Sequence, residues 1–295
     1  MVTPALIWAD LDPAASAMSK PARKRLSRAV EQAIAAEDTL GLAAAALGIE
    51  PPPAAALTRI ADGLEAGNRN WLLAEPVVLL PDRDALALLP LTAAPLDREE
   101  EDALAEAARA HFGDALTLER GRSGRWYAAI ETVDQATGVP LREAIGRAVE
   151  PASLAGGADA ARLRAFLNEL QMLWYAHPVN EARRADGRPE ASSLWLWGGG
   201  RLPIKPQAPL PMELRTNAPE LVGLALWLGL EREPLAEPEA GAPSPDDLVA
   251  IPSGEEVLGG AWLDKFAALR GELRIYAGGN EWRVPARRGL SRLLG

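Results

Sequence analysis

Apolar residues recur at helical spacing through much of the first part of the chain. Leu26, Val30 and Ile34 illustrate this spacing, which places them on one face of a helix. Ser19 stands where a helix cap is expected, just before the first apolar residues of this pattern. We therefore expect a helical amino-terminal part over residues 1–70.

Short apolar runs separated by turn residues replace the helical spacing over residues 71–150. Asp97 and Glu100 have the spacing of a capping box, which predicts the start of a helix. The apolar runs on either side of this helix predict strands at residues 77–80, 86–89, 116–119 and 125–131. The order β-β-α-β-β is typical of one layer of sheet covered by a helix.

The remaining residues, 151–295, are expected to form a further α/β part. An apolar stripe predicts a long helix over residues 159–176, and Ser193–Trp197 has the composition of a buried strand. Residues 231–247, rich in Pro, Glu and Ala, predict a flexible acidic loop. Shorter elements are predicted at residues 217–229, 248–251, 253–269 and 273–276. The fold class is therefore mixed α/β.

Composition narrows the function classes. The chain has 295 residues, a formal net charge of −10 and no cysteine. Missing cysteine excludes disulfides and thiolate ligands, and the negative charge opposes binding to nucleic acid. No apolar run reaches the roughly 20 residues of a membrane span, and the first residues lack the pattern of a secretory signal. We expect a cytoplasmic protein that binds neither nucleic acid nor membrane.

Several segments together resemble the RpfE-type regulatory proteins of proteobacteria. They begin at residues 71, 124, 166, 192 and 259 and read WLLAEPVVLLPDRD, GRWYAAI, FLNELQMLWYAHPVNEAR, SSLWLWGGG and GGAWLDKFAALRGELRIY. The family name implies a role in regulating pathogenicity factors. Two positions depart from the family pattern, because Val78 stands where a histidine is expected and Ser192 where an asparagine precedes Ser-Leu-Trp.

The segment Trp195–Gly200 also resembles a strand end of the archaeal-type cofactor-independent phosphoglycerate mutases, members of the alkaline phosphatase superfamily. That resemblance implies a related fold for the carboxyl-terminal part. The family's chemistry uses a serine nucleophile and two divalent ions held by Asp and His. This chain has two histidines, His111 and His177, and no serine stands in the motif expected after Ile7 and Trp8. We predict no catalytic residue, no metal site and no cofactor, and we do not expect metal-dependent mutase activity.

The tryptophans and glycines of the same segment are candidates for ligand binding. Gly198, Gly199 and Gly200, followed by Arg201, could wrap an anion with backbone amides, or form a tight turn beside neighbouring backbone. Trp195 and Trp197 share one face of their strand, because alternate residues do. They could stack on a ligand, or pack in the core against the apolar stripe of residues 166–174.

Polar residues of the long helix and its end form a second group of candidates. His177 and Asn180 could grip a ligand, or could satisfy loose backbone groups at the helix terminus. Glu169 precedes His177 by about two helical turns, so the two side chains could flank one pocket.

Two hypotheses about function follow. The first is a noncatalytic regulatory or interaction protein with a protein partner, built on a degenerate phosphoglycerate mutase-like scaffold. The alternative is a protein that binds a small anionic ligand, or a metal-independent enzyme, with its pocket near His177 and Gly198–Gly200. A subunit that works only inside a complex remains open as a third class.

Overall fold

The computed structural model describes residues 3–11, 18–36, 38–82, 85–91, 94–133, 138–145, 148–149, 159–206, 213–238, 243, 247–252 and 255–286. Helices and strands alternate along them, which confirms the α/β class. The chain divides into unit 1, Met1–Pro52 with Ile204–Gly295, and unit 2, Pro53–Pro203. Unit 2 is thus inserted into unit 1, which differs from the three consecutive parts expected from the sequence.

A seven-stranded sheet forms the centre of the described part of unit 1, in the order β10-β9-β11-β1-β12-β13-β2. β1 pairs in parallel with β11 on one side and with β12 on the other. All residues of β1 are buried, as is typical of a strand inside a parallel sheet. The strands are β1 (Ala5–Trp8), β2 (Val30–Ala33), β9 (Glu213–Arg215), β10 (Glu231–Glu233), β11 (Asp247–Ile251), β12 (Leu273–Ala277) and β13 (Asn280–Val284).

The expected helical amino-terminal part was wrong at two segments, because β1 and β2 are strands. Helix α1 (Lys20–Leu26) is capped by Ser19 as predicted, because the Ser19 hydroxyl accepts a hydrogen bond from the Ala22 amide. It ends before β2, whose residues are all exposed and which pairs antiparallel with β13. Pairing with a distant strand therefore overrides the helical spacing of the sequence in this segment.

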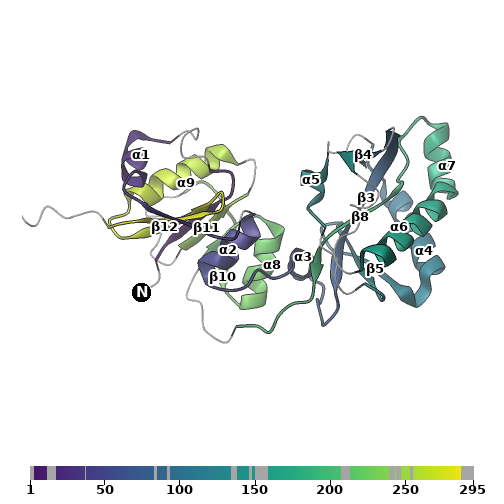
Figure 1. The fold of residues 1–295 in the computed structure, drawn as a ribbon, viewed down its shortest axis with the longest axis horizontal. Coiled ribbons are helices and arrows are strands. Elements are labelled where there is room, and N and C mark those ends of the chain that lie inside the picture. The colour runs from purple at the N-terminus through teal and green to yellow at the C-terminus, as the bar shows by residue number, and fades with distance from the viewer. Residues whose placement is uncertain are drawn as a thin grey trace, which may run out of the picture. The chain divides into compact units, whose positions relative to one another are not determined.

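Helices lie on both sides of this sheet (Figure 1). α1 packs against α9 (Glu256–Ala268), and Arg25 donates to the Ala267 carbonyl near the end of α9 at 2.9 Å. Trp262 and Phe266 of α9 belong to the same buried cluster as Trp8. α2 (Thr39–Leu47) contacts β1, β11 and β12, and it also contacts α8 (Pro219–Leu228). α8 ends at the predicted Gly229, which has a φ of 74°.

The long strand β3 (Trp71–Asp82) is the centre of the sheet in unit 2. Its first half pairs with β6 and its second half with β4, and β8 pairs with its opposite edge, all antiparallel. The remaining strands are β4 (Ala85–Pro90), β5 (Leu116–Arg120), β6 (Trp126–Ile130), β7 (Ala148–Val149) and β8 (Ser193–Gly200). The predicted β-β-α-β-β order is confirmed, and the strand predicted at Ser193–Trp197 joins the same sheet.

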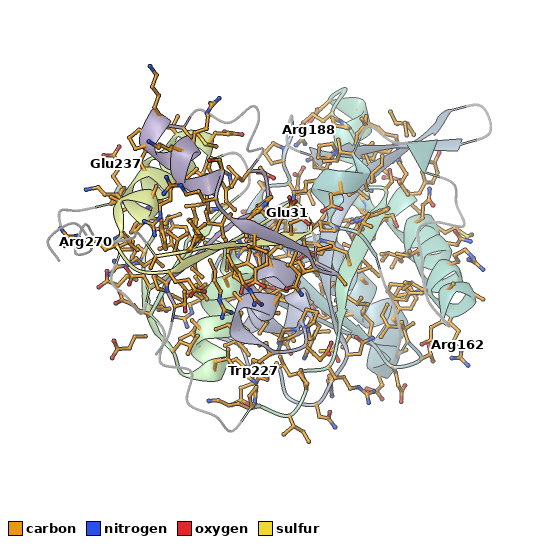
Figure 2. The ribbon with its side chains drawn as sticks, turned by 60° about the vertical axis from the view of Figure 1, so that its left-hand side comes forward. Glu31, Arg162, Arg188, Trp227, Glu237 and Arg270 are labelled. Atoms are coloured by element: carbon orange, nitrogen blue, oxygen red, sulfur yellow. The ribbon has the colours of Figure 1, made fainter. Side chains whose placement is uncertain are left out.

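The helices of unit 2 are α3 (Ala54–Ala61), α4 (Arg98–Phe112), α5 (Leu141–Ala144), α6 (Ala160–Tyr175) and α7 (Pro178–Ala185). α4 begins with the predicted capping box of Asp97 and Glu100. The predicted long helix is α6, and Arg162 lies near its start (Figure 2). Arg162 pairs with Asp159 at 2.7 Å. Pro178 occupies the first turn of α7, because proline needs no amide donor there.

Part of the predicted acidic loop 231–247 is ordered within unit 1. Glu231–Glu233 forms the edge strand β10, and Leu235 is buried in the core. Residues 239–242 and 244–246 of this loop lie outside the described residues, as do Arg83, Asp84 and Ser253. Among the residues that are described, no helix is both long enough and apolar enough to cross a membrane.

The close packing of α9 on β1 generates a prediction about stability. A Cβ atom at Gly259 would lie 2.7 Å from the Trp8 ring, which is almost fully buried. Gly259→Ala should lower the free energy of unfolding by about 1–3 kcal/mol, because overpacking outweighs the better helix propensity of alanine. Urea denaturation measures this change. Gly271→Ala is the control, since nothing lies within 4 Å of a Cβ there, and equal effects of both substitutions would contradict the prediction.

Candidate binding site

Glu169 and His177, predicted to flank one pocket, have separate partners. The Glu169 carboxylate on α6 lies 2.7 Å from His111 Nε2 at the end of α4. His177 precedes α7, where its Nδ1 accepts a hydrogen bond from the Val179 amide at 3.2 Å. Burial lowers the pKa of His177, which favours the neutral imidazole that accepting this bond requires. The structure therefore uses His177 as a helix cap.

Asn180 is fully buried and ties α7 to the segment before β8. Its Nδ2 donates to the carbonyls of Trp174 and Ala191, at 2.8 and 2.9 Å, and its Oδ1 accepts from the Ala191 amide at 3.0 Å. Both amide protons are thus used on backbone. The Ser192 hydroxyl accepts a hydrogen bond from the Leu79 amide at 3.1 Å. Asn180 and Ser192 both satisfy backbone groups.

Trp195 and Trp197 share one face of β8, but α6 does not cover that face. The alternate residues Leu194 and Leu196 pack with the stripe of α6 instead. Trp195 packs in a second cluster with Val77 and others, and Trp197 packs against that cluster. The expected packing of the tryptophans against residues 166–174 was therefore wrong by one residue, which is enough to turn a side chain to the other face of a sheet.

The glycines at the end of β8 allow this strand to approach the start of α3. A Cβ at Gly198 would lie 3.2 Å from the Ala54 Cβ, and one at Gly200 would lie 2.8 Å from the Pro53 Cβ. Gly198 has a φ of 67° and Gly200 a φ of 150°, which favour glycine. Gly200 also pairs with Trp71 in the β3–β8 ladder. Gly199 lies between them in β8. The close backbone approach considered from the sequence is what this segment shows.

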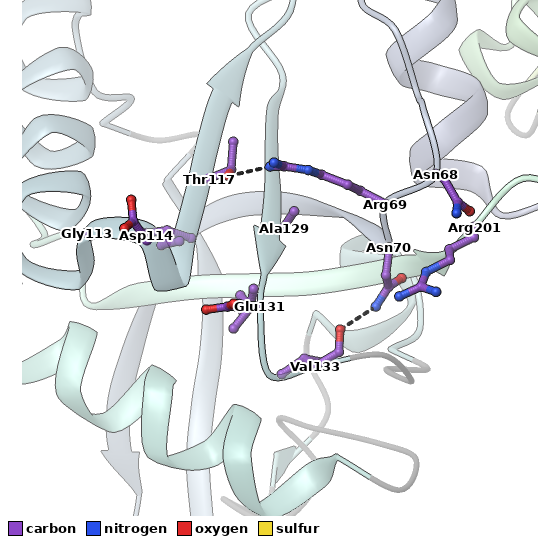
Figure 3. A pocket seen from close by; sticks show the side chains of 12 residues that line it. Asn68, Arg69, Asn70, Gly113, Asp114, Thr117, Ala129, Glu131, Val133 and Arg201 are labelled. Atoms are coloured by element: carbon purple, nitrogen blue, oxygen red, sulfur yellow. Dashed lines mark hydrogen bonds between the residues drawn. The ribbon is translucent and has the colours of Figure 1, made fainter.

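Arg201, one of the predicted site residues, lines a cavity that has a volume of about 500 Å³ and lies within unit 2 (Figure 3). We call this cavity the strand-end pocket. Its lining consists of Asn68, Arg69, Asn70, Gly113, Asp114, Leu116, Thr117, Ala129, Ile130, Glu131, Val133 and Arg201. Volumes of roughly 300–1,000 Å³ are typical of small-molecule sites.

Strand register explains why these residues meet. Leu116 at the start of β5 pairs with Ile130 at the end of β6, so Asp114 and Glu131 both stand just beyond this pair. In the same way, Trp71 pairs with Gly200, so Asn70 and Arg201 both stand just beyond that pair. Because β3 is antiparallel to both β6 and β8, the start of β3 lies beside the ends of β6 and β8, and the two pairs are close together. The pocket lies at this end of the strands.

The polar groups of the strand-end pocket are only partly satisfied. Arg69 Nη1 donates to Thr117 Oγ1 at 2.8 Å, and Asn70 Nδ2 donates to the Val133 carbonyl at 2.9 Å (Figure 3). Asn70 is only 5% exposed, and its Oδ1 has no hydrogen-bond partner among the described residues. A buried acceptor without a partner is costly, so this oxygen is suited to receive a donor from a bound molecule.

Sequence reasoning missed Asn68, Arg69, Asn70, Asp114 and Glu131. The signal available was positional, because the polar triplet Asn68–Asn70 precedes a strand directly and the two acids flank a predicted hairpin. The turn at residues 121–124 fixes which residues of that hairpin pair. Joining the hairpin edge to residue 201 required the β3–β8 pairing, which spans more than a hundred residues and has no local signal.

Glu75 lies on the face of the sheet away from α6. There Trp197 Nε1 donates a hydrogen bond to Glu75 Oε1 at 2.5 Å. Burial raises the pKa of the Glu75 carboxyl, and the hydrogen bond from Trp197 opposes this increase. Within the described ranges, no group of three or more His, Asp or Glu side chains is placed to hold a metal ion.

The capping role of His177 predicts a pH-dependent contribution to stability. Because folding lowers its pKa below 6.5, the contribution is complete above that value and is lost as the pH falls through the lowered pKa. Protonation removes the acceptor and places a cation at a helix amino terminus, which should cost about 1 kcal/mol. His177→Asn retains a cap that does not titrate. The difference in unfolding free energy between wild type and this variant should therefore change as the pH falls from 6.5 through the lowered pKa. A difference that stays constant with pH would argue against the capping role of His177.

Glu75 predicts the opposite dependence on pH. Its folded-state pKa is raised, so its contribution to stability is complete below 4.5 and is lost as the pH rises through the raised value. Glu75→Gln keeps an oxygen for the Trp197 donor and cannot ionise. Chemical denaturation should show the variant gaining stability relative to wild type as the pH increases. If the variant is no more stable relative to wild type at neutral pH than at low pH, burial does not destabilise the ionised Glu75 carboxylate.

Comparison with known proteins supports the fold. No family model and no curated protein sequence matches the chain. The PH0037 protein from Pyrococcus horikoshii is similar in structure, with a TM-score of 0.52 and 14% identity over 96% of this chain and 87% of that one. A cofactor-independent phosphoglycerate mutase from Thermoplasma acidophilum aligns with a TM-score of 0.45 and 16% identity, over 96% of this chain and 89% of that one. At such identities the likeness concerns the fold alone, and the fold comparison rests on the Pyrococcus protein.

Proposed function

We propose that this chain is a noncatalytic regulatory protein, built on a phosphoglycerate mutase-like scaffold, that binds a small ligand with an anionic group in the strand-end pocket. The observation that carries the proposal is the pocket itself, where Arg69 and Arg201 stand beside the half-satisfied amide of Asn70. Arginine recognises carboxylate and phosphate groups through its planar set of donors.

Binding without conversion is favoured by the chemistry of the lining. Nucleophilic catalysis by a hydroxyl needs a base within reach of it. The hydroxyl that lines the pocket belongs to Thr117, and it already accepts a hydrogen bond from Arg69. The two histidines of the chain are engaged elsewhere, His111 with Glu169 and His177 as a cap. The described lining therefore does not pair a hydroxyl with a histidine, which supports binding without conversion.

The regulatory part of the proposal rests on the resemblance of several segments to RpfE-type proteins. Such a protein would act in the cytoplasm, as composition suggests. Val78, which stands where relatives are expected to carry a histidine, is 3% exposed in the core beside α6. In this chain that position therefore contributes packing.

A protein partner is a second candidate, favoured by the exposed side of α6. Met172 is 76% exposed and Tyr175 is 65% exposed, within one of the segments that resemble the regulatory family. Large apolar side chains on a helix surface are common anchors for partner proteins. Arg184 lies over the Tyr175 ring at 4.8 Å, which holds this ring in place at the surface.

The proposed binding can be tested on the purified full-length chain. Thermal unfolding should shift upward with at least one of a set of millimolar probes: inorganic phosphate, small carboxylates and free amino acids. Arg69→Gln should weaken the apparent affinity derived from that shift at least tenfold, because the variant loses the positive charge that binds the anionic group. Arg98→Gln removes an exposed arginine of α4 outside the pocket and should leave the shift unchanged.

A parallel assay tests the absence of catalysis. The same preparation should not convert phosphoglycerates or simple phosphate esters in the presence of divalent cations. Metal-dependent turnover that survives further purification would overturn the noncatalytic assignment, whatever the outcome of the binding measurement.

A further inference from the structure

The strand-end pocket presents charges of both signs. Two arginines, Arg69 and Arg201, and two carboxylates, Asp114 and Glu131, line the same cavity. We propose that the ligand is a zwitterion with an ammonium group and a carboxylate, as in a free amino acid or a short peptide. This inference rests on the proposed binding function and specifies the class of ligand.

The carboxylate of such a ligand finds its donors around Arg69. This guanidinium donates one hydrogen bond to Thr117 and forms no ion pair with any described carboxylate. Thr117 therefore orients the guanidinium while leaving its other donors available. Asn68 adds an amide to the lining, and Arg201 adds a second positive charge. A planar carboxylate matches the paired donors of arginine.

The ammonium group has two carboxylates of the lining as acceptors. Asp114, on the single helical turn Gly113–Ala115, and Glu131, directly after β6, have no ion-pair partner among the described residues. Figure 3 shows Asp114 on the side of the pocket away from Arg201, with Glu131 between them. On the side of Arg201, Asn70 Oδ1 is a buried acceptor without a partner among the described residues, available to another donor of the ligand. Carboxylates accept hydrogen bonds from an ammonium group and balance its positive charge.

A simple anion fits this arrangement less well. Bound at the arginines, it would lie near Asp114 and Glu131, and burying a carboxylate near like charge is unfavourable. The whole chain also carries a formal net charge of −10, so its field repels small anions at long range. A zwitterion is neutral overall and matches both signs of the lining. The charge pattern therefore selects against simple phosphates and dicarboxylates.

Calorimetry and thermal shift on the full-length chain test the inference with probes that differ only at their ends. The probes are the free L-amino acids, and for each binder its N-acetyl derivative, which lacks the ammonium, and its amide, which lacks the carboxylate. We expect at least one free amino acid to bind, and blocking either end to weaken binding at least tenfold.

Variants of the pocket test separately how the ammonium end and the carboxylate end of the ligand are bound. Glu131→Gln should weaken the free amino acid at least tenfold while leaving the N-acetyl derivative unchanged or bound more tightly. Arg69→Gln should weaken the free amino acid and remove what remains of N-acetyl binding. Glu106→Gln is the control, because Glu106 is an exposed carboxylate of α4 outside the pocket.

The outcomes distinguish this inference from the proposed function. If phosphate or an N-acetylated probe binds as tightly as any free amino acid, with loss in Arg69→Gln, the pocket is an anion site and the zwitterion inference fails alone. If no probe binds, both fail. Binding that is unaffected by Arg69→Gln and by Glu131→Gln places the ligand elsewhere and also refutes both.

Discussion

The antiparallel pairing of β3 with β6 on one edge and β8 on the other is the interaction on which unit 2 depends. It brings together chain segments near residues 70, 130 and 200, and the β5–β6 hairpin places residue 114 at the same end of these strands. Each of these segments changes from apolar to polar where its strand ends. A single hydrogen-bonding register therefore builds the core and also gathers four charged side chains beyond it.

The pleat of β8 decides which candidates can share a site. Leu194 and Leu196 face the core of α6, whereas Trp195 and Trp197 face the opposite clusters. Side chains carried by α6 and α7, such as Glu169 and Asn180, belong to the first side. The strand-borne tryptophans belong to the second, so the sheet itself separates the two groups of predicted residues. Arg201 belongs to neither face of the sheet, because it lies beyond the end of β8.

Unit 1 shows how distant parts of a chain can determine a strand. β1 is held between β11 and β12, whose residues follow it by more than two hundred positions. A four-residue apolar run such as Ala5–Trp8 has no periodicity that distinguishes strand from helix. Its buried position becomes evident only once the parallel neighbours are in place. The exposed residues of β2 make the same point for an edge strand, since β13 supplies their hydrogen bonds.

The sequence by itself determined the elements whose signals are local. The capping box at Asp97, the apolar stripe of α6 and the glycine that ends α8 act through neighbours three or four residues away, and all were predicted correctly. It also determined the shortage of histidine and the absence of cysteine. Tertiary structure alone decided the insertion of unit 2 into unit 1, the face on which each tryptophan lies, and the meeting of Asn70 with Arg201 at one pocket. These depend on register between strands far apart in the sequence, and register is fixed by burial on whole faces of a sheet rather than by any short stretch of residues.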